Sequence, residues 1–242
     1  MLKRVVVFYL VVFLTVFTAF PVHSMFDSVG RSVEEAEENN LEYCEGGSEA
    51  LCFGSYYKIL PPTSYIHRLV VPDTIVIHTD DQSGKTPEKW VSSRTWNGLA
   101  GREDGGRSVH FGVGLDGVGQ FLPMYKEGVM QCRGAGSLYD SHSIQIEMAG
   151  RTYNYLVTGE ASPEMVDSIV AITQETVDLV VVLMDIYDIP IENVIGHYQI
   201  NGSGKTDPGN LFFEQYFLPL LRERIAKSNQ QSNQQGRLSE LR

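Results

Sequence analysis

Cysteine is scarce in this chain, with only 3 among its 242 residues. So few thiols exclude a scaffold held together by many disulfides. Basic residues are also outnumbered, because 19 Lys and Arg stand against 30 Asp and Glu and give a formal net charge of -11. A chain of this charge is poorly suited to the phosphate backbone of nucleic acid or to an anionic membrane surface. The sequence therefore predicts neither as a partner.

Two motifs of common enzyme classes are incomplete or missing. Gly84-Lys85-Thr86 and Gly204-Lys205-Thr206 resemble the end of a phosphate-binding loop, but Thr79 and Gln199 stand where its first glycine is required. The helical His-Glu-x-x-His motif of many metalloproteases is also absent. What the chain does contain is 43% hydrophobic and 10% aromatic residues, enough to form the core of one domain of catalytic size.

The N-terminus has the pattern of a secretory signal peptide. Lys3 and Arg4 precede an uncharged stretch at residues 5–20, and a cleavage site with small residues ends at Ser24. This stretch is shorter than the roughly 20 apolar residues that a membrane-spanning helix needs. We therefore expect residues 1–24 to be removed, no stable membrane span to remain, and the mature protein to be secreted or periplasmic.

The rest of the chain divides by composition into three parts. Residues 25–60 begin with an acidic, poorly apolar run and are predicted to form an extension that packs onto the main domain. Residues 61–227 contain the regular hydrophobic patterns and are predicted to form that domain. Residues 228–242 are rich in Ser, Asn and Gln, which predicts a mobile, disordered tail.

The three cysteines allow more than one pairing. Cys44 and Cys52 flank a pair of glycines in the extension, and an oxidising compartment would permit a disulfide between them. Cys132 is the alternative partner of either one. The sequence leaves this choice open.

Hydrophobic periodicity predicts an α/β fold with a mixed central β-sheet flanked by helices. Short β-rich runs predict strands at residues 74–77, 108–113, 144–148 and 193–195. Predicted helices cover residues 87–99, a long segment that begins at Ser162-Pro163, and residues 211–225, where Pro219 interrupts the periodicity.

Three candidate metal ligands lie at the end of a predicted strand or in the loop after one. Strand alternation places His78 at the end of the run Ile-Val-Ile-His-Thr-Asp, where it can face a cleft. His197 follows another predicted strand, and Asp207 lies in a glycine-rich loop that can fold back toward it. Two imidazoles and a carboxylate suit Zn²⁺, which keeps a fourth position for a water whose pKa falls to about 7.

Four sequence blocks, in order, identify a family resemblance. IVIHTD, SVHFGVGLDG, SIQIEMAG and GHYQINGSGKTDPG resemble the type-2 zinc N-acetylmuramoyl-L-alanine amidases, which include AmpD-like enzymes, phage lysozyme-type amidases and peptidoglycan recognition proteins. The resemblance covers roughly residues 70 to 225. It implies the fold of that family, a zinc ion held by His78, His197 and Asp207, and hydrolysis of the amide between N-acetylmuramic acid and L-alanine.

The resemblance also implies two catalytic residues. Glu147 and Lys205 match positions that serve catalysis in the AmpD-like branch, whereas Val109 and Asp207 depart from the tyrosine and the cysteine ligand of the phage branch. We expect Glu147 to act as general base and Lys205 to stabilise the oxyanion. His67, His110 and His142 are interpreted as structural or as neighbours of the substrate.

Further departures from the family pattern concern specificity. Gly134 stands where many members have histidine, Gln145 stands where glycine is common, and Asp140 replaces a frequent asparagine. Gly134 is expected to change contacts with the substrate, and the three departures together bear on fine specificity.

The leading hypothesis is a secreted zinc amidase that acts on peptidoglycan or muropeptide fragments. One alternative is a module that binds peptidoglycan without cleaving it, although such modules usually lack one metal ligand and this chain retains all three. The other alternative is a zinc-dependent cell-wall endopeptidase that cleaves a peptide bond of the stem instead.

Overall fold

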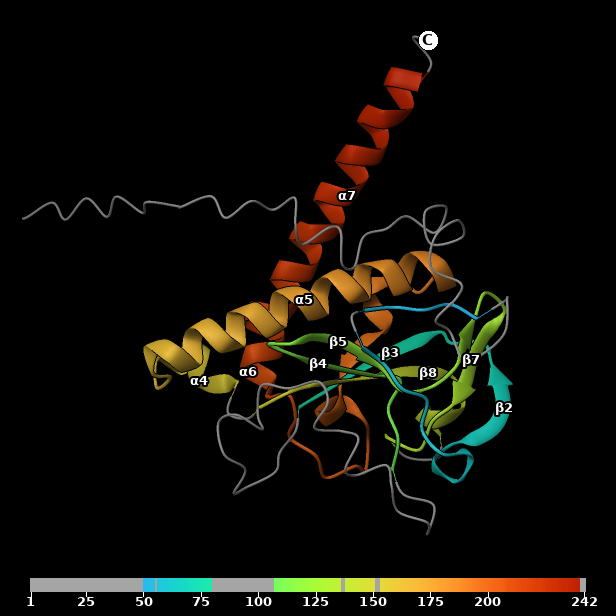
Figure 1. The fold of residues 1–242 in the computed structure, drawn as a ribbon. Helices are drawn as coiled ribbons and strands as arrows, with labels where there is room; N and C mark the ends of the chain where they lie inside the picture. The colour runs from blue at the N-terminus through green and yellow to red at the C-terminus, as the bar shows by residue number, and fades with distance from the viewer. Residues whose placement is uncertain (1–49, 55, 80–106, 136–137, 151–152, 240–242) are drawn as a thin grey trace, which may run out of the picture.

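The computed structural model describes residues 50–54, 56–79, 107–135, 138–150 and 153–239 (Figure 1). The predicted signal peptide, Cys44, most of the acidic extension and the predicted helix at residues 87–99 lie outside the described residues. Within the described part, no helix combines the length and the apolar composition needed to cross a membrane.

The described strands form one sheet of six strands and one of three. The strands are β1 (Tyr56–Tyr57), β2 (Ile66–Val70), β3 (Thr74–Thr79), β4 (Phe111–Gly114), β5 (Gly117–Gln120), β6 (Met124–Tyr125), β7 (Gly128–Gln131), β8 (Ser143–Met148) and β9 (Val194–Gly196). The α-helices are α4 (Asn154–Thr158), α5 (Pro163–Tyr187), α6 (Asn210–Phe212) and α7 (Leu218–Ser239). Short 3₁₀ helices are η2 (Pro62–Ser64), η4 (Tyr139–Ser141), η5 (Ile191–Asn193) and η6 (His197–Gln199), and η7 (Phe213–Phe217) is a π-helix.

The six-stranded sheet has the order β1-β5-β4-β8-β3-β9 and is mixed, as the sequence predicts. Strands β4, β8, β3 and β9 pair in parallel, and the hairpin of β4 and β5 is antiparallel. Each of the four predicted strands is present, with ends that shift by at most three residues. Two interior strands, β3 and β8, pair along their whole length, from Thr74 beside Ser143 to Thr79 beside Met148.

Alternation along β3 and β8 gives the sheet two different faces. Ile75 and Ile77 of β3, with Ile144 and Ile146 of β8, belong to the main hydrophobic core. The same core contains residues of α5, such as Leu179 and Leu183, and this helix contacts β4, β5 and β8. The opposite face carries Val76, His78, Gln145 and Glu147 and is polar at the carboxyl ends of the strands.

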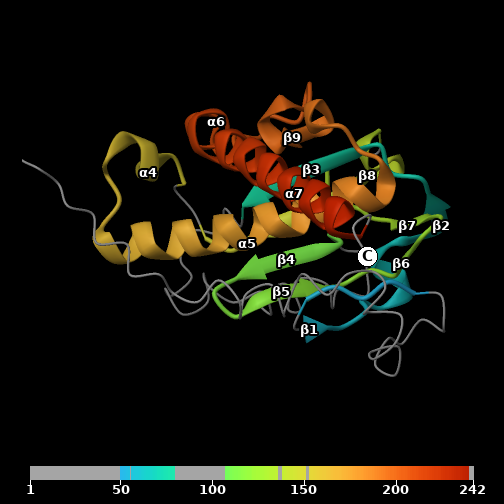
Figure 2. The ribbon, with the colours of Figure 1, turned by 90° about the horizontal axis from the view of Figure 1, so that it is seen from above.

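Helix α5 begins where the sequence predicts. The Ser162 side chain accepts a hydrogen bond from the backbone N–H of Met165 at 3.3 Å, and Pro163 occupies the first turn, where no N–H donor is needed. The second half of the helix contains an unbroken apolar run at residues 179–184. Leu179, Val180 and Leu183 of this run are all fully buried, so this part of the helix is covered on more than one side. Figure 2 shows α7 crossing beside α5, and Arg224 Nε of α7 contacts Asp178 Oδ1 of α5 at 2.8 Å.

The closing helix is longer than predicted and contains an irregular turn. A π-helix at Phe213–Phe217 immediately precedes α7, and Pro219, which has no N–H to continue the α-helical ladder, accounts for this irregularity. Residues 228–239, predicted as part of a mobile tail, instead continue α7, whose free end projects from the body (Figure 1). The scarcity of apolar residues in this segment predicts that it does not pack in the core, but its Gln, Arg and Leu residues still favour an α-helical backbone.

The described end of the predicted extension joins the large sheet at its edge. Strand β1 pairs in parallel with β5, and the backbone N–H of Leu51 donates to the carbonyl of Met124 at 2.8 Å. The small sheet, of order β2-β7-β6, was not predicted because its strands are short or interrupted, β2 by a register shift between Ile66 and Leu69. Cys52 is disulfide-bonded, whereas Cys132 is a buried free thiol and is therefore not its partner.

Candidate metal centre

Two of the predicted ligands come from the carboxyl ends of neighbouring parallel strands. His78 is the fifth residue of β3, and His197 follows β9 directly as the first residue of η6. Ile77 pairs with Gly196 in the ladder of β3 and β9, so the next residue of each strand reaches the same edge of the sheet. Side chains at this edge of a parallel sheet converge, which makes it a common place for binding sites.

The third predicted ligand returns to this edge on a closed loop. The backbone N–H of Tyr198 donates to the carbonyl of Asp207 at 3.0 Å, and the Ser203 hydroxyl donates to the carbonyl of His197 at 3.3 Å. Gly202 and Gly204 take positive φ values of 79° and 63°, which allows the chain to reverse within a few residues. The loop thus brings the Asp207 carboxylate beside His197.

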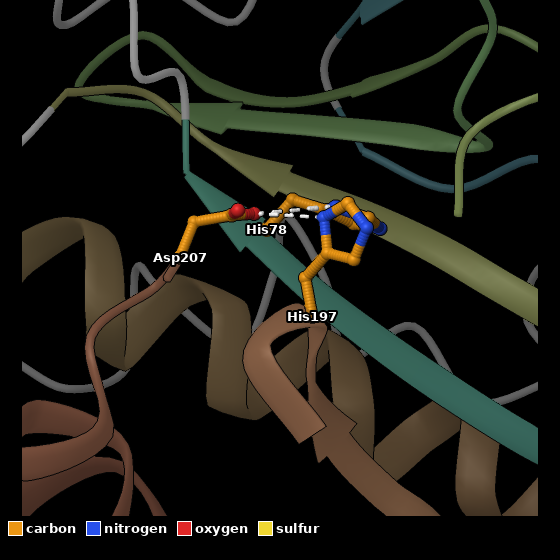
Figure 3. A group of neighbouring side chains, drawn as sticks. All are labelled: His78, His197 and Asp207. Carbon is orange, nitrogen blue, oxygen red and sulfur yellow. Dashed lines mark hydrogen bonds and ion pairs between the residues drawn. The ribbon is translucent and has the colours of Figure 1, made fainter. Parts of the chain in front are cut away.

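The three side chains form a compact triangle of ligand atoms (Figure 3). His78 Nδ1 lies 2.9 Å from His197 Nδ1, and Asp207 Oδ2 lies 3.1 Å from His197 Nδ1 and 3.4 Å from His78 Nδ1. Tetrahedral zinc with bonds of about 2.0–2.1 Å separates its ligand atoms by about 3.3 Å. The donor types and their spacing therefore fit a zinc ion, which these three side chains would hold.

The electrostatics of the triangle favour a charged carboxylate. Burial raises the pKa of Asp207, but hydrogen bonds and charges from His197 and His78 outweigh this effect and hold the pKa below its ordinary value. Its side chain is only 11% exposed, and those of the two histidines are still less so. An anionic oxygen beside two imidazole nitrogens in a sheltered position is a ligand set suited to a divalent cation.

Glu147 lies next to this triangle on the central sheet. It pairs with His78 in the ladder of β3 and β8, so both side chains leave the same face of the sheet. On its other side Glu147 pairs with Gly112 of β4, where no side chain competes for the space. Glu147 is buried, with only 6% of its surface exposed. Burial raises the pKa of the Tyr153 hydroxyl, and the negative charge of Glu147 raises it further.

Lys205 shares the loop of Asp207 but is not brought into the cluster. Its side chain is exposed, and its backbone N–H donates to the Ser203 hydroxyl at 3.2 Å. Among the described residues, no hydrogen bond or ion pair joins its ammonium group to the three clustered side chains. The role assigned to Lys205 therefore needs the side chain to turn toward the site when substrate is bound.

Sequence reasoning missed the residues directly behind His78. Gln145, which stands where glycine is common in the family, hydrogen-bonds His78 Nε2 through its Oε1 atom. Its backbone N–H donates to Nδ1 of His110 at 3.0 Å, and Nε2 of His110 donates to the carbonyl of Met130 at 2.9 Å. The spacing of two residues between Gln145 and Glu147 predicts that both lie on one face of β8, and the register with β3 makes this the face of His78.

Asp140 organises the segment that covers this face. Its Oδ1 atom accepts hydrogen bonds from the backbone N–H groups of Gly134 at 2.9 Å and Ala135 at 2.8 Å, and the Cys132 thiol lies 3.7 Å away. Burial raises the pKa of Asp140 despite these hydrogen bonds. Asp140 therefore fixes the backbone of this segment, and nothing in the structure explains the departure from asparagine.

Comparisons with known proteins agree with the fold and show the family. The family model of N-acetylmuramoyl-L-alanine amidases matches residues 68–210, more than half of the chain. The structure of PlyL is similar at a TM-score of 0.51 and 19% identity, over 69% of this chain and 94% of that one. The catalytic domain of XlyA (TM-score 0.51, 19% identity) and a mutant endolysin from Bacillus subtilis (0.51, 21%) each align over 69% of this chain and 97% of their own. At these identities the likeness shows the fold; no curated protein matches the chain.

Proposed function

Because the chain belongs to the N-acetylmuramoyl-L-alanine amidase family, we propose that it is a zinc-dependent hydrolase of the amide bond between N-acetylmuramic acid and L-alanine in peptidoglycan or its fragments. The observation that carries the proposal is the convergence of His78, His197 and Asp207, whose ligand atoms all lie within 4.8 Å of one another. These three side chains would hold the ion. Zinc held by three protein ligands would supply Lewis-acid chemistry that operates at neutral pH.

Glu147 is the proposed general base. The attacking water must lose a proton and the leaving amine must gain one, and a carboxylate beside the reacting atoms can transfer both in turn. Glu147 is nearly buried and pairs with the ligand His78 on the same face of the sheet. The glycine at position 112, opposite Glu147 on β4, leaves space for the substrate amide to approach.

Lys205 is the proposed second contributor, through the charge of its ammonium group. A compact positive charge near the amide oxygen would stabilise the oxyanion that develops as water adds. Its exposed position on the loop two residues before Asp207 allows the side chain to reach an incoming substrate. Lys205→Met is expected to lower kcat without loss of zinc, and unchanged kcat would identify Lys205 as a solvated charge only.

The proposal is tested by metal analysis and product identification on defined muropeptides. Purified protein is expected to contain about one zinc per chain and to release a stem peptide with a free L-alanine amine from an intact glycan. Cleavage within the stem peptide would identify an endopeptidase, and binding without any cleavage would identify a recognition module. Either of these two results overturns the amidase proposal.

Two variants separate metal binding from chemistry. Asp207→Ala should lose both zinc and activity, whereas Glu147→Gln should keep the zinc and lose activity by about 10²- to 10⁴-fold. Glu160→Gln is the matched control, because Glu160 is an exposed glutamate outside the sheet and should retain full activity. Full activity in Glu147→Gln would refute the role of Glu147 as the base.

Export from the cytoplasm is a separate part of the proposal. It is supported by the basic residues and the uncharged stretch before Ser24, and by the disulfide at Cys52, since disulfides persist mainly in oxidising compartments. N-terminal sequencing of protein recovered outside the cytoplasm should begin at residue 25. Recovery of the uncleaved chain in the cytoplasm alone would refute export.

A further inference from the structure

The imidazole of His78 is held on both of its nitrogen atoms. Nδ1 faces His197 and Asp207, and Nε2 contacts the Oε1 atom of Gln145. Gln145 lies on β8, one position along the face from Glu147, and is fully buried. An amide that is completely shielded from water is costly unless both of its ends are hydrogen-bonded, so the partners of Gln145 reveal what it does.

A chain of hydrogen bonds fixes which end of the Gln145 amide faces His78. The carbonyl of Tyr139 can only accept, so the Ser143 hydroxyl, 2.6 Å away, must donate to it. The Ser143 oxygen then accepts from the amide nitrogen of Gln145 at 2.5 Å. The amide oxygen is left to face His78, and because an oxygen of this kind only accepts, His78 Nε2 must carry the proton.

We propose that Gln145 is a positioning residue that locks His78 in the tautomer with its proton on Nε2, so that the Nδ1 lone pair is directed at the metal position. This inference rests on the proposed zinc function. A metal-bound histidine commonly donates its other N–H group to a carboxylate or carbonyl oxygen, which fixes the tautomer and the ring orientation. Here a side-chain amide, oriented through Ser143 by a backbone carbonyl, performs this task.

The surroundings of Gln145 keep its side chain in place. A Cβ atom on Gly134 would lie 3.3 Å from Gln145 Oε1 and 2.9 Å from the carbonyl oxygen of Ser108, so the absence of a side chain at position 134 makes room for the amide. The backbone of Gln145 is tied to that of His110, whose N–H donates to the Gln145 carbonyl at 2.9 Å. The two departures from the family pattern, Gly134 and Gln145, thus occupy one space and are explained together.

The first test measures the tautomer in metal-free protein by ¹⁵N NMR of the His78 imidazole. The wild type should show the proton on Nε2. Gln145→Met has a similar volume but no amide, and should show a mixture of both tautomers. Gln145→Glu, which keeps an oxygen facing His78, should restore the wild-type pattern. A role in packing alone would be satisfied by methionine and would leave the tautomer unchanged.

The second test measures zinc affinity by competition with a chelator. Gln145→Met should bind zinc about 10- to 100-fold more weakly than the wild type, the range found when such outer partners are removed, and Gln145→Glu should recover most of the loss. Equal affinity and an equal tautomer in Gln145→Met would overturn the inference. If the wild type itself binds no zinc, the proposed function fails, whereas the tautomer measurement still decides the role of Gln145.

Ser143→Ala provides an independent variant should Gln145→Met not fold. It leaves the amide in place but removes the group that fixes its orientation, so the amide can turn its nitrogen toward His78. The NMR spectrum should then show part of the His78 population with the proton on Nδ1, and zinc affinity should fall by a smaller factor than in Gln145→Met. A wild-type spectrum together with wild-type affinity would refute the hydrogen-bond chain.

Discussion

Acidification is expected to destabilise this protein through His110, a buried histidine that supports the site without belonging to it. His110 is fully buried. Its Nε2 atom donates to the carbonyl of Met130, and its Nδ1 atom accepts from the backbone N–H of Gln145. A proton added at Nδ1 would face that N–H group, donor against donor, in a place without water. The neutral ring therefore fits its surroundings and the charged ring does not.

The size of this effect follows from the pKa. Burial lowers the pKa of His110 from 6.5 to about 4, so below 6.5 the unfolded chain takes up a proton that the folded chain resists. The stabilisation from a neutral His110 is fully present above pH 6.5, decreases as the pH falls from 6.5 to 4, and is lost below 4. A shift of this size corresponds to roughly 3 kcal/mol in total, of which about 2 kcal/mol is lost between pH 7 and pH 5.

Urea denaturation at pH 7, 6 and 5, with a chelator present to remove metal effects, measures this loss. Other groups also titrate over this range, so the quantity of interest is the difference between the wild type and His110→Gln, which lacks the imidazole. The free energy of unfolding of the wild type should fall by about 2 kcal/mol more than that of the variant. Parallel pH profiles, or an NMR titration of His110 near 6.5, would refute the reasoning.

Three further substitutions test the packing that holds the site. Leu183→Ala on α5, at a fully buried position of the main core, should lower the free energy of unfolding by about 2–5 kcal/mol in urea denaturation; a smaller loss would mean that the cavity collapses. Gly134→Ala should cost about 1–3 kcal/mol, because its Cβ would lie 2.9 Å from the Ser108 oxygen, and an unchanged midpoint would contradict this close approach. Tyr187→Phe should cost about 1 kcal/mol by removing the hydrogen bond to the Tyr125 carbonyl at 2.8 Å, and equal thermal midpoints would show that this bond contributes nothing.

The sequence predicted the parts of the fold whose signal is local. The strand ending in His78, the capped start of α5 at Ser162 and the mixed sheet all follow from alternation, periodicity and capping. Strands β1 and β2 were not predicted, because each pairs with a strand that is distant in sequence. The hairpin of β6 and β7 was missed because β6 has only two residues. The helix at residues 228–239 was not predicted, because a scarcity of apolar residues indicates that a segment does not pack in the core but does not indicate its backbone conformation.

The candidate site shows the same division. Strand alternation indicates that His78 reaches the edge of the sheet, and a glycine-rich loop indicates that Asp207 can return to it, so the sequence could nominate these residues. The hydrogen bond between Tyr198 N–H and the Asp207 carbonyl, which closes the loop, has no sequence signal. Gln145 and His78 are 67 residues apart in sequence and make a diagonal contact between two neighbouring strands, which only the register of those strands reveals.

The backbone around the three candidate ligands is stabilised to different degrees. His78 belongs to a central strand that is paired on both sides and is braced from behind by Gln145. His197 follows β9 directly and shares the edge of that sheet. Asp207 is on a loop, and the Tyr198 hydrogen bond beside it contributes only about 1 kcal/mol. Loop opening would therefore displace the carboxylate before either imidazole, because the hydrogen bonds that close a loop break more readily than the ladder of a paired strand.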